Sequence, residues 1–195
     1  MHSTPLAPAL DQLLQSRSDL WRGHQRPQGQ VVASGRADLD DILPGGGWPC
    51  GRLIELLPSD LGVGEFSLLL PALAQRSSTG QPVALIAPPL VPCPQALSQA
   101  GVDLRRLLVV RDGQHALWAA EHLLRSALCG AVVIWHPALP PQLTALRRLQ
   151  LAAEQGQALS VLMYQPHQTA PALSSGLRLR IESGPRWQRL SGGWQ

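Results

Sequence analysis

The chain contains no lysine, because all sixteen of its basic residues are arginine. No ammonium group is therefore available to hold a nucleotide phosphate. Charged residues make up only 15% of the chain, and no apolar run reaches the ~18 residues of a membrane span, so we expect a soluble protein without membrane contact. The three cysteines, Cys50, Cys93 and Cys129, are far apart and include no C-x-x-C pair, which argues against a disulfide framework and a zinc site. The first 21 residues lack the pattern of a secretory signal, so a cytoplasmic location is expected.

The length of 195 residues predicts one domain with a short extension. Leucines at near-helical spacing indicate an amphipathic helix over residues 1–22, and a stretch rich in Gly, Gln and Pro at 23–35 resembles a linker. The main domain then spans 36–195, with a tail from about residue 183. A net charge of +3 is compatible with a nucleic-acid or acidic protein partner but is too small to require one.

Strand-like and helix-like segments alternate through the main domain, which predicts an α/β fold with a mostly parallel sheet flanked by helices. The expected strands are 52–57, 83–87, 107–110, 131–135 and 160–164. The expected helices are 65–76, 94–100, 115–128 and 141–155, each followed by a glycine. Segments 177–181 and 187–190 follow without an intervening helix and predict a final antiparallel hairpin. Pro71 falls inside the first expected helix, where it should bend the segment.

The segment 51–70 resembles the strand, loop and helix of a phosphate-binding P-loop that lacks the phosphate-binding residues. Gly62 and Gly64 still permit a tight turn between strand and helix. In a working loop of the G-x-x-x-x-G-K-[ST] type, the last glycine is followed by a lysine and then by a hydroxyl residue. This chain has Glu65 and Phe66 at those two positions. A carboxylate repels a triphosphate and a phenyl ring offers no oxygen to Mg²⁺, so we expect a pseudo-ATPase without cofactor or catalytic residue.

A second strand carries the same kind of loss. The run AVVIWHP at 131–137 has Trp135 or His136 where a magnesium-orienting aspartate belongs in a Walker B strand. We favour the interpretation that Trp135 fills the space left by a nucleotide. A new pocket at this strand end stays the alternative. His115 and His122 lie seven residues apart on one expected helix, but no further ligand is near in sequence, so a metal site is not expected.

The run SGRADLDDILPGGGWPCGRLIELL at 34–57 resembles the RecA recombinase family. Residues 38–40 match its short helix, 45–49 its G-G-x-P turn and 51–57 its G-R-I-x-E-I strand. The segment 166–176, which corresponds to a DNA-binding loop of that family, holds no arginine and no aromatic residue. Direct DNA contact is therefore expected to be weak or indirect.

The stretch from about residue 20 to 181 closely resembles the ImuA family of accessory proteins in SOS-regulated translesion synthesis. Besides the run at 34–57, the segments that carry this resemblance are GVGEFSLLLPAL, ALWAAEHLLRSALCGAVVIW and RRLQLAAEQG. This resemblance implies a non-catalytic role in damage-induced mutagenesis, through contacts with RecA, with ImuB and with an error-prone replicative-type polymerase. The cell-division inhibitor SulA is related in fold and also lacks a functional P-loop. The alternative is therefore a SulA-type inhibitor that binds the division tubulin homologue.

Both ends of the chain carry candidate partner-binding residues. The amphipathic helix is the first candidate for docking on RecA, although docking on its own domain stays open, and the carboxyl-terminal tail is the second. Their apolar, aromatic and arginine side chains have the types favoured at interfaces: Leu10, Leu13, Leu14, Trp21, Arg186, Trp187, Arg189 and Trp194.

Overall fold

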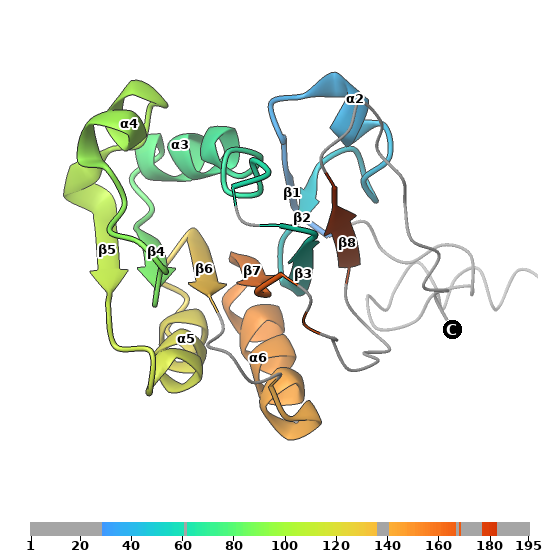
Figure 1. The fold of residues 1–195 in the computed structure, drawn as a ribbon, viewed down its shortest axis with the longest axis vertical. Helices are drawn as coiled ribbons and strands as arrows, with labels where there is room; N and C mark the ends of the chain where they lie inside the picture. Colours follow the sequence, from blue (N-terminus) through green and yellow to red (C-terminus); the bar gives the residue numbers. More distant parts are fainter. Residues whose placement is uncertain (1–28, 61, 136–140, 167, 169–176, 183–195) are drawn as a thin grey trace, which may run out of the picture.

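The computed structural model describes residues 29–60, 62–135, 141–166, 168 and 177–182, and Figure 1 shows its fold. The central sheet has six strands in the order β5-β4-β6-β7-β3-β8, and every neighbouring pair runs parallel. This confirms the expected RecA-like α/β architecture. No helix in the described part of the chain has the length and apolar character needed to cross a bilayer.

The elements agree closely with the segments expected from the sequence. The sheet consists of β3 (Arg52–Pro58), β4 (Val83–Ile86), β5 (Leu107–Val110), β6 (Ala131–Trp135), β7 (Leu159–Met163) and β8 (Leu177–Ile181). The helices are α2 (Ala37–Asp40), α3 (Leu70–Ser78), α4 (Pro94–Gln99), the 3-10 turn η1 (Leu104–Arg106), α5 (Ala116–Arg125) and α6 (Leu143–Gly156). Because the central strands are buried on both faces, their apolar runs are nearly continuous, which made them recognisable.

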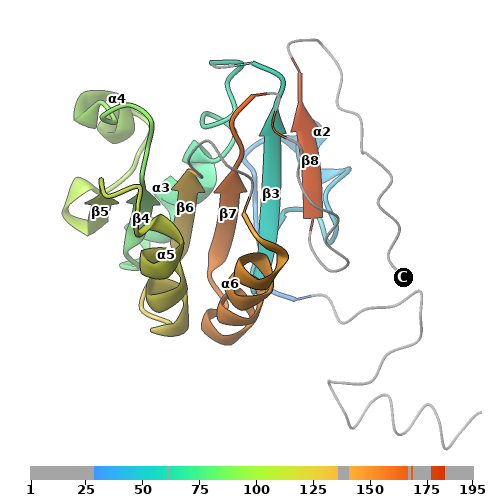
Figure 2. The same cartoon turned by 60° about the horizontal axis from the view of Figure 1, so that its bottom comes forward.

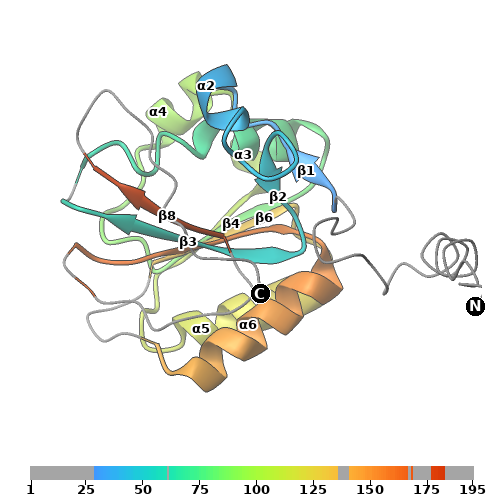
Figure 3. The same cartoon turned by 90° about the vertical axis from the view of Figure 1, so that its right-hand side faces the viewer.

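Helices cover the two faces of the sheet unequally. Figures 2 and 3 show α2, α3 and α4 on one face and the longer α5 and α6 side by side on the other. Successive side chains of β3 point to opposite faces of the sheet and so belong to two separate hydrophobic cores. Ile54 and Leu56 pack in the core that contains α3, whereas Leu53 packs in the core beneath α5 and α6. The carboxyl ends of the strands lie between these layers at one edge of the sheet.

The sequence-based expectation for the first helix is wrong. The first helix begins at Leu70 rather than at residue 65, and Pro71 occupies its first turn, where a missing N–H costs nothing and no bend arises. Turns occupy most of the stretch between Gly62 and Leu69 instead. Strand β8 pairs in parallel with β3. The second half of the expected antiparallel hairpin, 187–190, lies outside the described residues, so the hairpin stays a prediction.

A small second sheet lies ahead of β3. Val31–Val32 (β1), within the range expected to be a linker, pairs antiparallel with Trp48–Pro49 (β2). Gly47 permits this close pairing, since a Cβ there would lie 2.6 Å from the Val32 carbonyl oxygen. Trp48 is completely buried. The GGGWP motif therefore anchors this segment to the core that contains α3.

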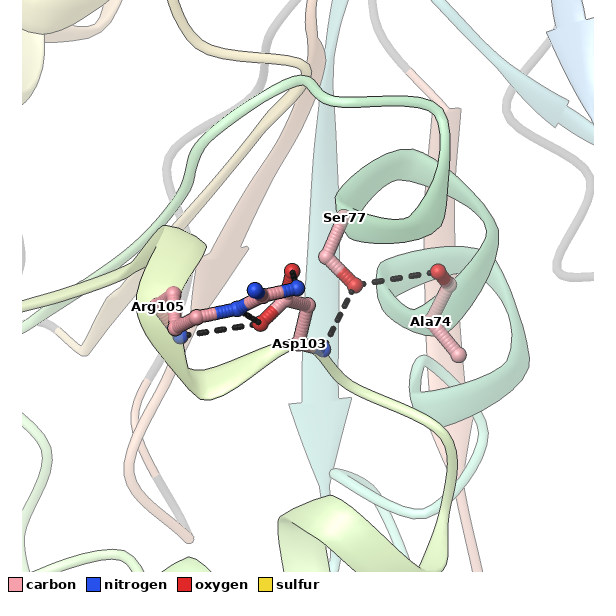
Figure 4. Close-up of polar contacts among 4 residues, drawn as sticks. All are labelled: Ala74, Ser77, Asp103 and Arg105. Atoms are coloured by element: carbon pink, nitrogen blue, oxygen red, sulfur yellow. Dashed lines mark hydrogen bonds and ion pairs between the residues drawn. The ribbon is translucent and has the colours of Figure 1, made fainter.

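A buried serine joins α3 to the turn before β5, as Figure 4 shows. The Ser77 hydroxyl donates to the Ala74 carbonyl at 3.0 Å and accepts the Asp103 N–H at 3.0 Å. Asp103 in turn accepts the Arg105 backbone N–H and its guanidinium, both at 3.0 Å, and this hydrogen bonding lowers the pKa of the Asp103 carboxyl. The sheet edge at β5 is thus fixed to α3 through one hydroxyl.

Candidate functional site

The P-loop-like segment lies at the carboxyl edge of the sheet, where doubly wound proteins bind their ligands. It leaves the end of β3 and leads into α3 (Figure 2). The Ser59 N–H donates to the Ile181 carbonyl oxygen at 2.7 Å, which fixes the start of the segment to the end of β8. The strands β7 and β6 end beside it in the same sheet.

Two aromatic rings from separate parts of the chain meet at this edge. Phe66 of the loop and Trp135 at the end of β6 have ring centroids 5.4 Å apart and an interplanar angle of 58°, a tilted arrangement favourable for aromatic pairs. Both side chains are half-buried and pack against the core that contains α3. Phe66, at the hydroxyl position of the P-loop pattern, therefore contacts Trp135, which lies near the position of the Walker B aspartate.

The residue in the lysine position is also partly enclosed. Glu65 is half-buried, and its Oε2 atom is buried without a hydrogen-bond partner among the described residues. At about 4 Å and an effective dielectric of about 20, a charged carboxylate repels one phosphate charge by about 4 kcal/mol. This position therefore disfavours the ligand that a P-loop lysine attracts.

The loop itself is turned tightly by glycine. Gly62 and Gly64 have φ values of 76° and 90°, a region that favours glycine and was expected from their positions. After them, the Leu68 N–H donates to the Gly64 carbonyl at 3.3 Å and the Leu69 N–H to the Phe66 carbonyl at 3.0 Å. These two amides therefore donate to carbonyls of the loop itself.

A buried polar network beneath the loop was missed by the sequence analysis. Glu55, in the middle of β3, is 1% exposed. Its Oε1 atom accepts the Tyr164 hydroxyl at 2.6 Å, and its Oε2 atom accepts Nε and Nη2 of Arg178 at 3.1 and 2.8 Å. Burial, and then the bond to Glu55, raise the pKa of the Tyr164 hydroxyl. The network connects the residue that follows β7 with the middle of β3 and with β8. The sequence did contain one signal of this network, because Glu55 is a polar residue inside an apolar strand.

The remaining candidates are not brought together. His115 Nδ1 lies 2.7 Å from Asp112, which lowers the pKa of the Asp112 carboxyl, whereas His122 contacts Trp118. Within the described ranges, no three His, Cys, Asp or Glu residues are placed to hold a metal ion. His136 and all eight candidate partner-binding residues at the two ends lie outside the described residues.

The parallel sheet and its strand, loop and helix at the β3 edge define the class: this is a RecA-related α/β protein. Residues 41–169, more than half of the chain, match the family described as the MT3502 N-terminal domain. The chain belongs to this family and is ImuA-like, as its sequence motifs predicted.

Recombinases are among the similar proteins. RecA from Corynebacterium efficiens is 35% identical over 111 residues, which cover 56% of this chain and 28% of that protein. RecA from Leptospira biflexa is 35% identical over 106 residues, 53% of this chain and 27% of that protein. RecA from Acinetobacter baumannii is 34% identical over 107 residues, 54% and 30% of the two chains. The matched part therefore spans less than a third of these RecA proteins.

A solved structure of SulA from Pseudomonas aeruginosa is also similar. It is 29% identical in sequence, and the match covers 57% of this chain and 96% of that chain, with a TM-score of 0.46.

Proposed function

We propose that this protein is a non-catalytic RecA-like accessory factor of SOS-induced translesion synthesis, which acts through contacts with RecA, with ImuB and with an error-prone polymerase. The observation that carries the proposal is the contact between Phe66 and Trp135 at the carboxyl edge of the sheet. Aromatic side chains stand where a P-loop protein keeps its hydroxyl residue and its magnesium-orienting strand end. Membership of an ImuA-like, RecA-related family supports the biological context.

The electrostatics of the loop support the absence of nucleotide chemistry. Glu65 places a carboxylate at the lysine position, and the chain has no lysine elsewhere. Removing a P-loop lysine loses an attraction, whereas adding a carboxylate also introduces a repulsion of about 4 kcal/mol per phosphate charge at about 4 Å. The parallel sheet and its packed cores are retained all the same. A protein that keeps this fold without phosphate-binding groups is better explained by selection for partner-binding surfaces than by selection for ATP hydrolysis.

Isothermal titration with ATP and Mg²⁺ tests the non-catalytic part of the proposal, with purified RecA as the positive control. We expect no heat of binding and no phosphate release from the wild-type chain. A Glu65→Lys, Phe66→Thr double variant is the matched comparison, and we expect it to remain weak because Trp135 and the late start of α3 are unchanged. Tight binding and hydrolysis of ATP by the wild-type chain would refute the proposal.

The partner part is tested by co-purification with each purified candidate. Deleting residues 1–22 should abolish co-purification with RecA while circular dichroism of the main domain is preserved. Deleting residues 183–195 is the comparison, and loss of binding only in this variant would assign the contact to the tail. Binding to the division tubulin homologue and to none of the replication proteins would instead support the SulA-type alternative.

A further inference from the structure

The outer surface of α5 and α6 carries an exposed aromatic and arginine stripe. Trp118, His122 and Arg125 are spaced i, i+4 and i+7 on α5, so they share one face of that helix. The buried residues Ala116, Ala120 and Leu124 define the opposite face, toward the sheet. Trp118 is 59% exposed, a large fraction for an indole ring. The stripe is therefore directed to solvent.

Contacts within the stripe hold its side chains in place. The rings of Trp118 and His122 have centroids 4.3 Å apart. Arg125 lies 3.0 Å from Glu121 Oε1, and Arg148 of α6 pairs with the other oxygen of the same carboxylate. The Glu121 side chain is only 7% exposed, whereas Arg125 and Arg148 are 49% and 61% exposed. One buried carboxylate thus positions two arginines that are each about half exposed. Because these side chains are already held in place, less conformational entropy is lost when a partner binds them.

The charges of the two helices select an anionic partner. The charged side chains of α5 and α6 are three arginines and two glutamates, and one of those glutamates is the buried Glu121. The exposed charge is therefore mainly cationic. Leu151, three residues after Arg148 on α6 and so on a neighbouring part of that helix surface, adds exposed apolar area, since it is 60% exposed. Tryptophan and arginine beside an aliphatic residue are the types enriched at binding hot spots.

The two ends of the sequence do not supply an acidic segment. Residues 1–28 contain two aspartates and three arginines, and residues 183–195 contain two arginines and no acidic residue. A second copy carries the same net charge of +3. A nucleic acid needs several phosphates neutralised at once, whereas the two helices together have a net charge of only +1. An acidic protein segment with an apolar anchor matches both the charge and the exposed ring.

We propose that the stripe formed by Trp118, His122, Arg125 and Arg148 is a docking site for an acidic segment of another protein that inserts an aromatic or aliphatic side chain beside Trp118. Carboxylates of that segment bind the outward donors of Arg125 and Arg148, and its apolar side chain covers the indole. The site is separate from the P-loop-like loop, so the inference does not rest on the proposed function.

Fluorescence anisotropy tests the proposal with the full-length chain. The probe is a labelled synthetic peptide in which Asp and Glu alternate with Leu and Phe. The same peptide with Asn and Gln in place of the acids, and a single-stranded thymidine oligonucleotide, serve as comparisons. We expect the acidic peptide to bind, binding to weaken as salt rises, and the amide peptide to bind about tenfold more weakly or worse.

Variants assign the binding to the stripe. Trp118→Ala and Arg125→Ala should each weaken binding about tenfold, whereas Trp118→Phe should retain most of it. Arg125→Ala leaves Glu121 paired with Arg148, so the fold should be preserved, which unchanged thermal unfolding would verify. Leu90→Ala and Arg105→Ala are controls at other exposed positions and should change nothing.

Three results would overturn the proposal. The acidic peptide could fail to bind, or it could bind the Trp118→Ala and Arg125→Ala variants as tightly as the wild type. Tighter binding of the oligonucleotide, lost in the same two variants, would assign the stripe to nucleic acid instead.

Discussion

Replacing Arg178 by methionine should destabilise the protein strongly, because it leaves the Glu55 carboxylate buried beside one hydroxyl only. Arg178 supplies both donors to Glu55 Oε2, at 3.1 and 2.8 Å. Breaking a buried ion pair from one side costs about 3–5 kcal/mol. The Arg178 side chain is 29% exposed, so water partly replaces the lost donors and the lower end of that range applies. We expect a loss of about 3 kcal/mol, or roughly 6–12 °C in Tm for a domain of this size.

Urea unfolding followed by circular dichroism measures this change. Arg180→Met is the matched control, since Arg180 lies two residues further along β8 and is exposed; its effect should stay within about 0.5 kcal/mol. A triple variant with Glu55→Leu, Tyr164→Phe and Arg178→Met removes every polar member together. It should recover most of the lost stability, because apolar replacement of a whole buried network is often neutral. If Arg178→Met and Arg180→Met unfold alike, the network does not stabilise the fold as argued.

Three further predictions concern single side chains. Tyr164 is the chain's one tyrosine, and its raised pKa means that the folded state holds the proton more tightly than the unfolded state. Stability should therefore be insensitive to this group below about pH 9 and fall as pH rises above about 10, with tyrosinate absorbance appearing together with loss of circular dichroism. Ionisation near pH 10 in a still-folded protein would contradict the buried hydroxyl. Ser77→Ala should cost about 1–3 kcal/mol in urea unfolding by leaving the Asp103 N–H without its acceptor, and hydrogen exchange at Asp103 should accelerate; unchanged exchange would count against the link. Phe66→Ala should cost about 1–2 kcal/mol, since the ring is only half-buried, and titration should reveal no new ATP affinity; a gain would mean that the ring alone blocks the site.

The order and type of the main elements could be predicted from local pattern. Strands β5 and β6 occupy the ranges 107–110 and 131–135 that their apolar runs indicated. The start of α3 could not be placed by periodicity, because apolar residues recur at helical spacing through the preceding turns. The stronger signal there was Pro71, whose fixed φ suits the first turn of a helix. That error concerns a boundary and leaves the fold class unchanged.

Pairings across the sheet were beyond sequence reasoning. Glu55 lies 109 residues from Tyr164 and 123 residues from Arg178, so no local spacing indicates that they meet. Glu121 is similar: its partner Arg125 is one helical turn away and predictable, whereas Arg148 belongs to another helix. The exposed stripe around Trp118 likewise depends on which face of α5 the sheet buries.

The sequence by itself determined the chemistry missing from the P-loop-like segment, because residue identity alone excludes a lysine and a hydroxyl at Glu65 and Phe66. Only the tertiary structure decided what occupies that edge. The parallel order of β3, β7 and β6 places Phe66 against Trp135, and the burial of one side of α5 leaves Trp118 and Arg125 on the surface. Local sequence specifies which groups exist, whereas long-range packing sets which of them meet.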